Sequence, residues 1–123
     1  MAKKILFVDD EPDVLRVALF RLKKAGYEVT TATNGLEALE LAQKLIPDLM
    51  LLDIRIPIFT GLEVCKKVKS DEKLKHIPVI LFTASVQDMD TKVKEVGADG
   101  YLLKPFNPEQ LLEKVKKFLG ANK

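Results

Sequence analysis

Cysteine and histidine are almost absent from this sequence, which has one of each among 123 residues. A lone histidine makes neither a zinc site nor a Ser-His-Asp triad, and a lone cysteine cannot close an internal disulfide. Cys65 stands between Leu62 and Val68 at helical spacing, so we expect a buried structural thiol. His76 lies in a polar stretch, where we expect a loop. Neither residue is given a functional role.

A strong net charge and a long hydrophobic run are also missing. Twenty basic residues against eighteen acidic ones leave a formal charge of +2, too small for nucleic-acid binding by bulk electrostatics. No apolar run approaches the roughly 20 residues that span a bilayer, and the run after residues 1–4 is too short for a signal peptide. With 47% hydrophobic and 31% charged residues, the composition is typical of a globular protein. We expect one cytoplasmic domain over residues 1–123.

The chain does have a regular alternation of apolar, strand-like runs and amphipathic stretches. The expected strands cover residues 4–8, 27–32, 49–52, 78–82 and 101–103, and the expected helices cover about 12–25, 35–46, 62–69, 87–96 and 108–119. The second helix is assigned an apolar stripe of Leu36, Leu39, Ala42 and Leu45. This alternation predicts a parallel sheet with helices on both faces. The run 27–32 alternates in polarity, which places it near a sheet edge.

Polar residues end four of the five expected strands. They are Asp9 and Asp10 after the first strand, Asp53 after the third, Thr83 after the fourth and Lys104 after the fifth. The carboxyl ends of parallel strands meet at one edge, where open α/β sheets bind their ligands, so we expect these side chains to lie close together. Asp53 follows four apolar residues that do not need a carboxylate to fold, and desolvating that charge is costly unless a cation or a donor meets it.

The expected cluster suits phosphoryl chemistry. Three carboxylates at close range repel one another, and Mg²⁺, which prefers oxygen ligands, would keep them ionised. Lys104 offers a positive charge and Thr83 a hydroxyl donor to phosphate oxygens. With Asp53 as nucleophile, the set is sufficient to form an aspartyl phosphate. Taken singly the signals are weaker, because an acidic pair also suits a turn and a helix start, and a threonine also suits a helix cap.

Five motifs occur in one order: Asp9–Asp10, Asp53 with Pro57 and Gly61, Thr83–Ala84, Tyr101 and Lys104–Pro105. On these motifs the chain resembles the receiver domains of two-component response regulators, in particular the stand-alone chemotaxis type, along nearly its whole length. The resemblance implies a flavodoxin-like (βα)5 fold with strand order 2-1-3-4-5. It also implies that Asp53 is the phosphoacceptor. Asp10 would be a direct Mg²⁺ ligand, Asp9 a ligand through water, and Arg55 a ligand through its backbone carbonyl.

The resemblance further implies a switch and protein partners. Lys104 would bind a phosphoryl oxygen, Thr83 would move towards the phosphate, and Tyr101 would turn inward, which repacks the surface of the fourth helix, fifth strand and last helix. The donor would be a histidine kinase or a phosphotransfer protein. With no output domain expected, the effect would pass to a downstream target protein, and the chain would catalyse only its own phosphorylation and slow dephosphorylation. Arg55 and Ser85 occupy positions that tune this loss, and Thr60 stands where an aspartate is common.

Several alternatives stay open. The helix at 12–25 carries Val14, Val17 and Phe20 outside its core stripe, and either neighbouring elements cover them or they dock the phosphoryl donor. One alternative function is a phosphatase that uses an aspartyl nucleophile on small phosphoesters, although such enzymes usually carry an acid where this chain has Arg55. Another is a non-phosphorylated, receiver-like binding module. Flavin binding is poorly supported, because no Gly- and Thr-rich loop follows the first strand.

Overall fold

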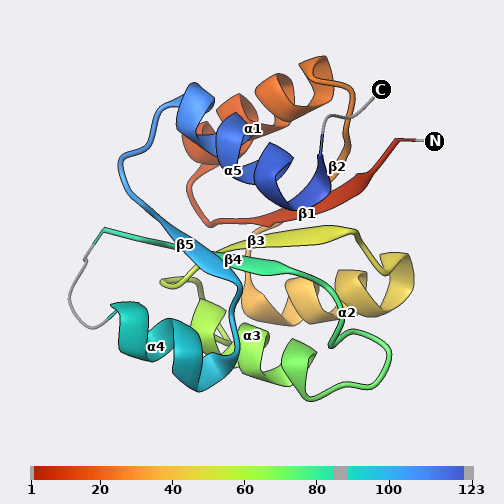
Figure 1. The fold of residues 1–123 in the computed structure, drawn as a ribbon, viewed down its shortest axis with the longest axis vertical. Coiled ribbons are helices and arrows are strands. Elements are labelled where there is room, and N and C mark those ends of the chain that lie inside the picture. Colours follow the sequence, from red (N-terminus) through yellow and green to blue (C-terminus); the bar gives the residue numbers. More distant parts are fainter. Residues whose placement is uncertain (1, 85–88, 121–123) are drawn as a thin grey trace.

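The computed structural model describes residues 2–84 and 89–120. Its elements are β1 (Lys4–Val8), α1 (Pro12–Lys24), β2 (Glu28–Ala32), α2 (Gly35–Leu45), β3 (Leu49–Asp53), α3 (Gly61–Lys69), β4 (Val79–Thr83), α4 (Met89–Val96), β5 (Gly100–Leu103) and α5 (Pro108–Leu119) (Figure 1). All neighbouring strands pair in parallel, in the order β2-β1-β3-β4-β5. The predicted (βα)5 fold and strand order are confirmed.

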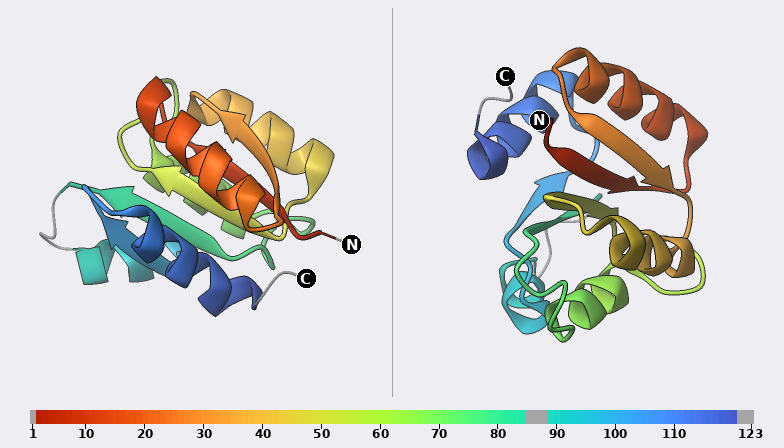
Figure 2. Two further views of the ribbon diagram at one scale, coloured as in Figure 1. Left: turned by 90° about the horizontal axis from the view of Figure 1, so that it is seen from above. Right: turned by 90° about the vertical axis from the view of Figure 1, so that its right-hand side faces the viewer.

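The sheet lies between two layers of helices, with α1 and α5 on one face and α2, α3 and α4 on the other (Figures 1 and 2). Successive side chains of a strand point to opposite faces, so β1 supplies Ile5 and Phe7 to the core under α1 and α5. Leu6 and Val8 enter the other core. In β3 every residue is buried, because this strand is central and covered on both faces. β2 forms one edge of the sheet and is only partly buried, as its alternating pattern predicted.

Capping residues begin helices α2 and α3 just after the carboxyl ends of the strands, at the left in Figure 1. Asn34 caps α2 by accepting a hydrogen bond from the Glu37 N–H at 2.8 Å. Thr60 and Glu63 form a capping box at the start of α3. Thr60 therefore does at this position what an aspartate could also do. A side chain at Gly61 would collide with the backbone of Asp53, so glycine keeps this loop close to the end of β3.

One residue of the apolar stripe predicted for α2 does not face the core. Leu36 is 45% exposed, whereas Ala38 and Ala42 of α2 are fully buried. A helix turns once in 3.6 residues, so positions three apart rotate steadily away from one face. Four residues at a strict spacing of three cannot all face the sheet, and Leu36 is the one that points to water.

Other predictions differ from the structure only at element ends or lie beyond it. Strand boundaries shift by one residue, and Asp53 is the last residue of β3 rather than the first of the loop. The fourth helix begins at Met89, while the expected start at Gln87 and the tuning position Ser85 lie outside the described residues.

Cys65 is buried as expected, and burial raises its pKa to about 11. His76 is exposed in the turn before β4.

No helix in the described part of the chain is long and apolar enough to cross a membrane. This agrees with the short apolar runs of the sequence.

Candidate functional site

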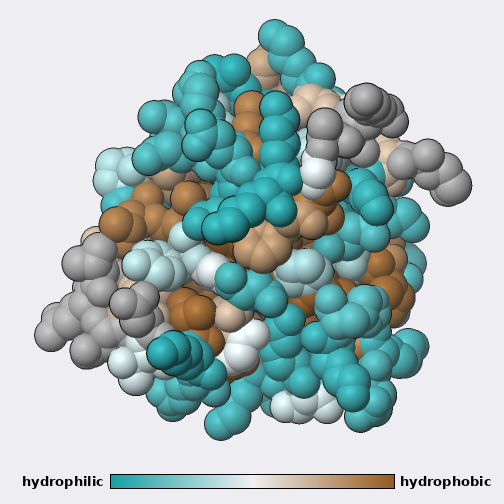
Figure 3. All heavy atoms as spheres, in the orientation of Figure 1, coloured by the Kyte–Doolittle hydropathy of each residue, from teal (hydrophilic) through white to brown (hydrophobic). Residues whose placement is uncertain are grey.

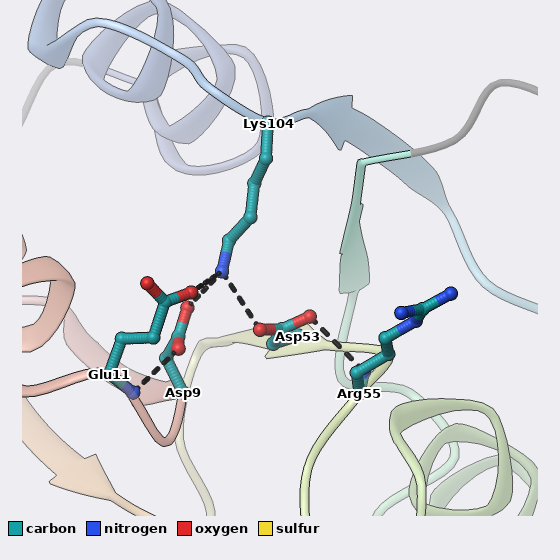
Figure 4. A network of polar contacts seen from close by, with 5 residues as sticks. All are labelled: Asp9, Glu11, Asp53, Arg55 and Lys104. Atoms are coloured by element: carbon teal, nitrogen blue, oxygen red, sulfur yellow. Dashed lines mark hydrogen bonds and ion pairs between the residues drawn. The ribbon is translucent and has the colours of Figure 1, made fainter.

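The carboxyl ends of β1, β3 and β5 bring together an ammonium group and three carboxylates (Figure 4). The Nζ atom of Lys104 lies 2.7 Å from Oδ2 of Asp9 and 2.8 Å from Oδ2 of Asp53. A third contact, at 3.1 Å, joins it to Oε1 of Glu11. Since β4 separates β5 from β3, the lysine reaches across a strand to bind these acids. The sequence prediction that Asp9, Asp53 and Lys104 meet is therefore correct in the structure.

Burial and hydrogen bonding oppose each other at this lysine. Burial lowers the pKa of Lys104, but the hydrogen bonds to Asp53, Asp9 and Glu11 outweigh it, and the pKa is raised overall. Burial also raises the pKa of Asp9, against hydrogen bonds from Lys104 and from the Glu11 N–H. The lysine therefore stays charged, and its charge is what makes a fully buried aspartate tolerable.

Asp53 is held from both sides. Its Oδ2 atom accepts the hydrogen bond from Lys104, and its Oδ1 atom accepts one from the Arg55 N–H at 3.2 Å. The Arg55 side chain extends away from the carboxylate and is exposed (Figure 4). The main chain of Arg55 thus faces the site while its guanidinium group does not contact Asp53. Gly61, whose N–H donates to the Ile54 carbonyl at 2.9 Å, fixes the loop that carries Arg55.

Three aspartates form a set of oxygen donors suited to a cation. Asp9, Asp10 and Asp53 can each direct one carboxylate oxygen to within 4.8 Å of the other two. Asp9 and Asp53 are buried and Asp10 is exposed, so the cluster opens to solvent on one side. Carboxylate donors with room for water match the preference of Mg²⁺, which keeps several waters when it binds a protein. The chemistry of the donor set therefore fits this metal.

A cleft of about 270 Å³ lies over these residues. Its lining comprises Asp10, Glu11, Asp53, Ile54, Arg55, Thr83, Ala84 and Lys104. Thr83 ends β4, and its carbonyl accepts a hydrogen bond from the Lys104 N–H at 2.7 Å, so the lysine and the threonine are tied through the backbone. Tyr101 is not part of this lining. It is half-buried on β5 and packs against the core under α2, α3 and α4.

A larger hollow of about 530 Å³ adjoins the site between the start of α1 and the segment that joins β5 to α5. Val14, Val17 and Phe106 line it, together with Lys104. Val17 is 51% exposed and Phe20, further along α1, is 63% exposed. Neighbouring elements therefore do not cover these two side chains. For Val17 and Phe20, the prediction that neighbouring elements cover them is wrong.

Glu11 is the residue of the site that sequence reasoning missed. The strand-end pattern gave Glu11 no role, although this residue directly follows the acidic pair at the end of β1. That position in the loop was the available signal. Its contact with Lys104 depends on how two strands that are not neighbours in the sheet face each other, which sequence spacing does not reveal.

A parallel sheet of order 2-1-3-4-5 with an aspartate–lysine cluster at its carboxyl edge defines the class of the flavodoxin-like signalling domains. The chain belongs to the family of response regulator receiver domains, whose sequence model matches residues 5–116. Receiver domains are signalling proteins of two-component systems, in which phosphorylation and switching of protein partners are typical. Domains of this kind interact with histidine kinases and downstream targets.

Two curated relatives illustrate the family. The chain is 40% identical over 123 residues to the polar-differentiation response regulator DivK of Brucella anthropi. The alignment covers 98% of each protein. It is 39% identical over 120 residues to the alkaline phosphatase synthesis transcriptional regulatory protein PhoP of Bacillus subtilis, which covers 97% of this chain and 49% of PhoP. The chain thus spans about half the length of PhoP and nearly all of DivK.

Solved structures show the same architecture. The chemotaxis response regulator CheY4 of Vibrio cholerae superposes with a TM-score of 0.91 at 38% identity, over 96% of this chain and 99% of CheY4. The receiver domain of the sensor histidine kinase PA1611 from Pseudomonas aeruginosa superposes with a TM-score of 0.88 at 28% identity, over 98% and 100% of the two chains. That domain has a magnesium ion coordinated in its active-site cleft.

Proposed function

We propose that Asp53 accepts a phosphoryl group from a histidine kinase or a phosphotransfer protein in a Mg²⁺-dependent reaction, and that this alters the surface used to bind a partner protein. The observation that carries the proposal is the placement of the Lys104 ammonium 2.8 Å from Asp53, in a cleft where three aspartates approach one another within 4.8 Å. Phosphoryl transfer requires mainly positioning and neutralisation of charge, and these residues supply both.

The metal would be held by Asp9, Asp10, Asp53 and the backbone carbonyl of Arg55. When bound, it supplies positive charge to the phosphoryl oxygens and to the attacking carboxylate. Asp9 is fully buried and already bound to Lys104, whereas Asp10 is exposed. This difference supports a direct role for Asp10 and a contribution of Asp9 through water. The relative with a magnesium ion in its cleft supports the choice of metal.

In the transfer step, a carboxylate oxygen of Asp53 attacks the phosphorus of a phosphohistidine. A P–O bond forms as the P–N bond breaks, and the departing imidazole keeps the electron pair and takes up a proton from water. Lys104, which donates to Asp53 beforehand, donates to a phosphoryl oxygen afterwards. Dephosphorylation is the attack of water on phosphorus, which returns the Asp53 carboxylate and releases inorganic phosphate.

The switch would involve Thr83 and Tyr101. Thr83 lines the cleft, and a threonine hydroxyl can donate to a phosphoryl oxygen. Thr83 pairs with Leu103 across β4 and β5, and Tyr101 pairs with Leu81 in the same ladder, so a shift of Thr83 acts on the strand that carries Tyr101. In Figure 3, hydrophobic side chains on the β5 side of the molecule lie mainly in the band between the two helix layers. Leu103 of β5 is 41% exposed. This α4–β5–α5 side is the proposed output surface.

The phosphoryl donor would dock on α1 beside the cleft. The exposed Val17 and Phe20 and the hollow leave an apolar area beside the cleft that contains Asp53. A phosphatase acting on small phosphoesters is the weaker candidate. The position two residues after the nucleophile holds Arg55, which has no carboxyl group to act as general acid and whose side chain extends away from the site (Figure 4).

Incubation with acetyl phosphate and Mg²⁺, followed by intact-mass analysis, tests the proposal. We expect a gain of one phosphoryl group on the wild type, none without Mg²⁺, and none on Asp53→Ala. Peptide mapping should place the label on Asp53. A labelled Asp53→Ala protein, or a wild type that takes up no label, would refute the assignment of the phosphoacceptor.

A further inference from the structure

The three acids that bind Lys104 are not equivalent. Asp9 and Asp53 lie 2.7 and 2.8 Å from Nζ, and their side chains are 0% and 8% exposed. Glu11 lies 3.1 Å away, and its side chain is 61% exposed. Glu11 therefore makes the longest of these contacts and is the only one of the three acids with ready access to water.

Glu11 also occupies an unusual place for its residue type. It is the N-cap of α1, where Ser, Thr, Asp and Asn are preferred, but its side chain makes no capping hydrogen bond. The side chain instead turns to Lys104 across the cleft (Figure 4). Meanwhile the Glu11 N–H donates to Oδ1 of Asp9 at 3.0 Å. The residue thus supports one aspartate through its backbone and binds that aspartate's lysine through its side chain.

The number of N–H donors on the ammonium group limits how many acceptors Lys104 can bind at once. A lysine has three N–H donors, and Lys104 contacts three carboxylates. After transfer, the hydrogen that Lys104 gave to Asp53 passes to a phosphoryl oxygen, and a second phosphoryl oxygen can take a hydrogen only if Asp9 or Glu11 gives one up. Leaving Asp9 would strand a buried charge, which is costly. Leaving Glu11 places an exposed carboxylate in water, which costs little.

We propose that Glu11 is a positioning residue that occupies Lys104 before phosphorylation and yields its place to the incoming phosphoryl group. In this arrangement Glu11 slows phosphorylation, since its contact with the lysine must break. This inference rests on the proposed function of Asp53 and concerns the regulation of the same site.

Three variants separate the contact from the charge. Glu11→Gln removes the charge and weakens the contact, while Glu11→Asp keeps the charge on a side chain one methylene shorter, which withdraws the carboxylate from Nζ. Asp13→Asn is the matched control, because Asp13 is an exposed acid two residues away whose partner is Arg16 at 2.8 Å. It removes the same charge from the start of α1 without touching Lys104.

The measurement is the rate of phosphoryl labelling by acetyl phosphate at saturating Mg²⁺. We expect both Glu11 variants to react about threefold faster than the wild type, the scale of one exposed ion pair, and Asp13→Asn to match the wild type. Affinity for beryllium fluoride with Mg²⁺, an equilibrium readout that involves no reaction, should rise by the same factor in both Glu11 variants.

The outcomes are distinguishable. If Glu11→Asp behaves as the wild type while Glu11→Gln and Asp13→Asn are both faster, net charge explains the effect and the inference is wrong. It is also wrong if all four proteins are labelled at one rate, an outcome that leaves the phosphoacceptor role of Asp53 intact. Absence of any label on the wild type instead overturns the proposed function, and this inference with it.

Discussion

Two lysines bind acids at opposite edges of the sheet, and they differ in the partners they hold. Lys69, at the end of α3, donates to the Ile77 carbonyl at 2.7 Å, to Asp99 at 2.9 Å and to the Lys75 carbonyl at 3.4 Å. Lys104 donates to carboxylates alone. The two side chains are similarly buried, at 18% and 16% exposed. Burial therefore does not distinguish them, and the chemistry of their acceptors does.

Backbone carbonyls cannot leave a lysine unless the chain around them moves. Lys69 fixes the turn before β4, and its partner Asp99 also accepts a hydrogen bond from the Val79 N–H at 2.8 Å. One ammonium faces one carboxylate there, and the charges balance. At Lys104 one ammonium faces three carboxylates, so an excess of negative charge remains for a cation to neutralise. The first arrangement is architectural, and the second can exchange its partners.

The largest effect is expected for Lys104→Met. Without Mg²⁺, the variant leaves the buried Asp9 without its cation. We therefore expect the free energy of unfolding to fall by about 3 kcal/mol. With saturating Mg²⁺ we expect the difference in unfolding free energy from the wild type to narrow, because the proposed metal would neutralise the same carboxylates. Urea unfolding with and without Mg²⁺ measures this. If Mg²⁺ left this difference in unfolding free energy unchanged, the carboxylates that bind Lys104 would not be the ones that bind the metal.

A smaller effect is expected for Lys69→Met. The loss of three hydrogen bonds leaves the Ile77 carbonyl and Asp99 without this donor, at a cost of about 2 kcal/mol in the free energy of unfolding. Mg²⁺ should not reduce this loss, since no part of the network belongs to the carboxyl edge. Lys66→Met, which removes the same charge from the last turn of α3, is the control and should be nearly neutral. Recovery of Lys69→Met by Mg²⁺ would erase the distinction between the two lysines.

The sequence could predict most of the fold because its local signals agree. Apolar runs and amphipathic stretches indicate the same alternation of strands and helices, and the helix caps found in the structure at Asn34, Thr60 and Asn107 agree with it. The exception, Leu36, shows where such reasoning fails. Its residue type favoured burial, but which face of a helix meets the sheet is set by packing of the whole element.

The candidate site could be predicted as a set of strand-end residues but not as a network. Parallel strands dictate that Asp9, Asp53 and Lys104 share one edge of the sheet. Which acid the lysine binds depends on side-chain reach across β4 and on the turn that follows β1. Side-chain reach and loop geometry also decide that Glu11 contacts Lys104 and that Lys69 binds backbone carbonyls.

The smallest effect, and the one that most sharply isolates the excess charge, is expected for Asp10→Ala. Asp10 is exposed and lies within reach of Asp9 and Asp53, so its removal relieves repulsion, and the melting temperature without Mg²⁺ should rise slightly. The same change removes one of the three carboxylate donors of the proposed metal site, so we expect Mg²⁺ to raise the melting temperature of the wild type but not that of Asp10→Ala. Thermal unfolding over a Mg²⁺ titration, with Asp13→Asn as the control that keeps the increase, measures both. If Asp10→Ala were still stabilised by Mg²⁺ as strongly as the wild type, the cation would bind elsewhere, and the excess of carboxylates around Lys104 would need another explanation.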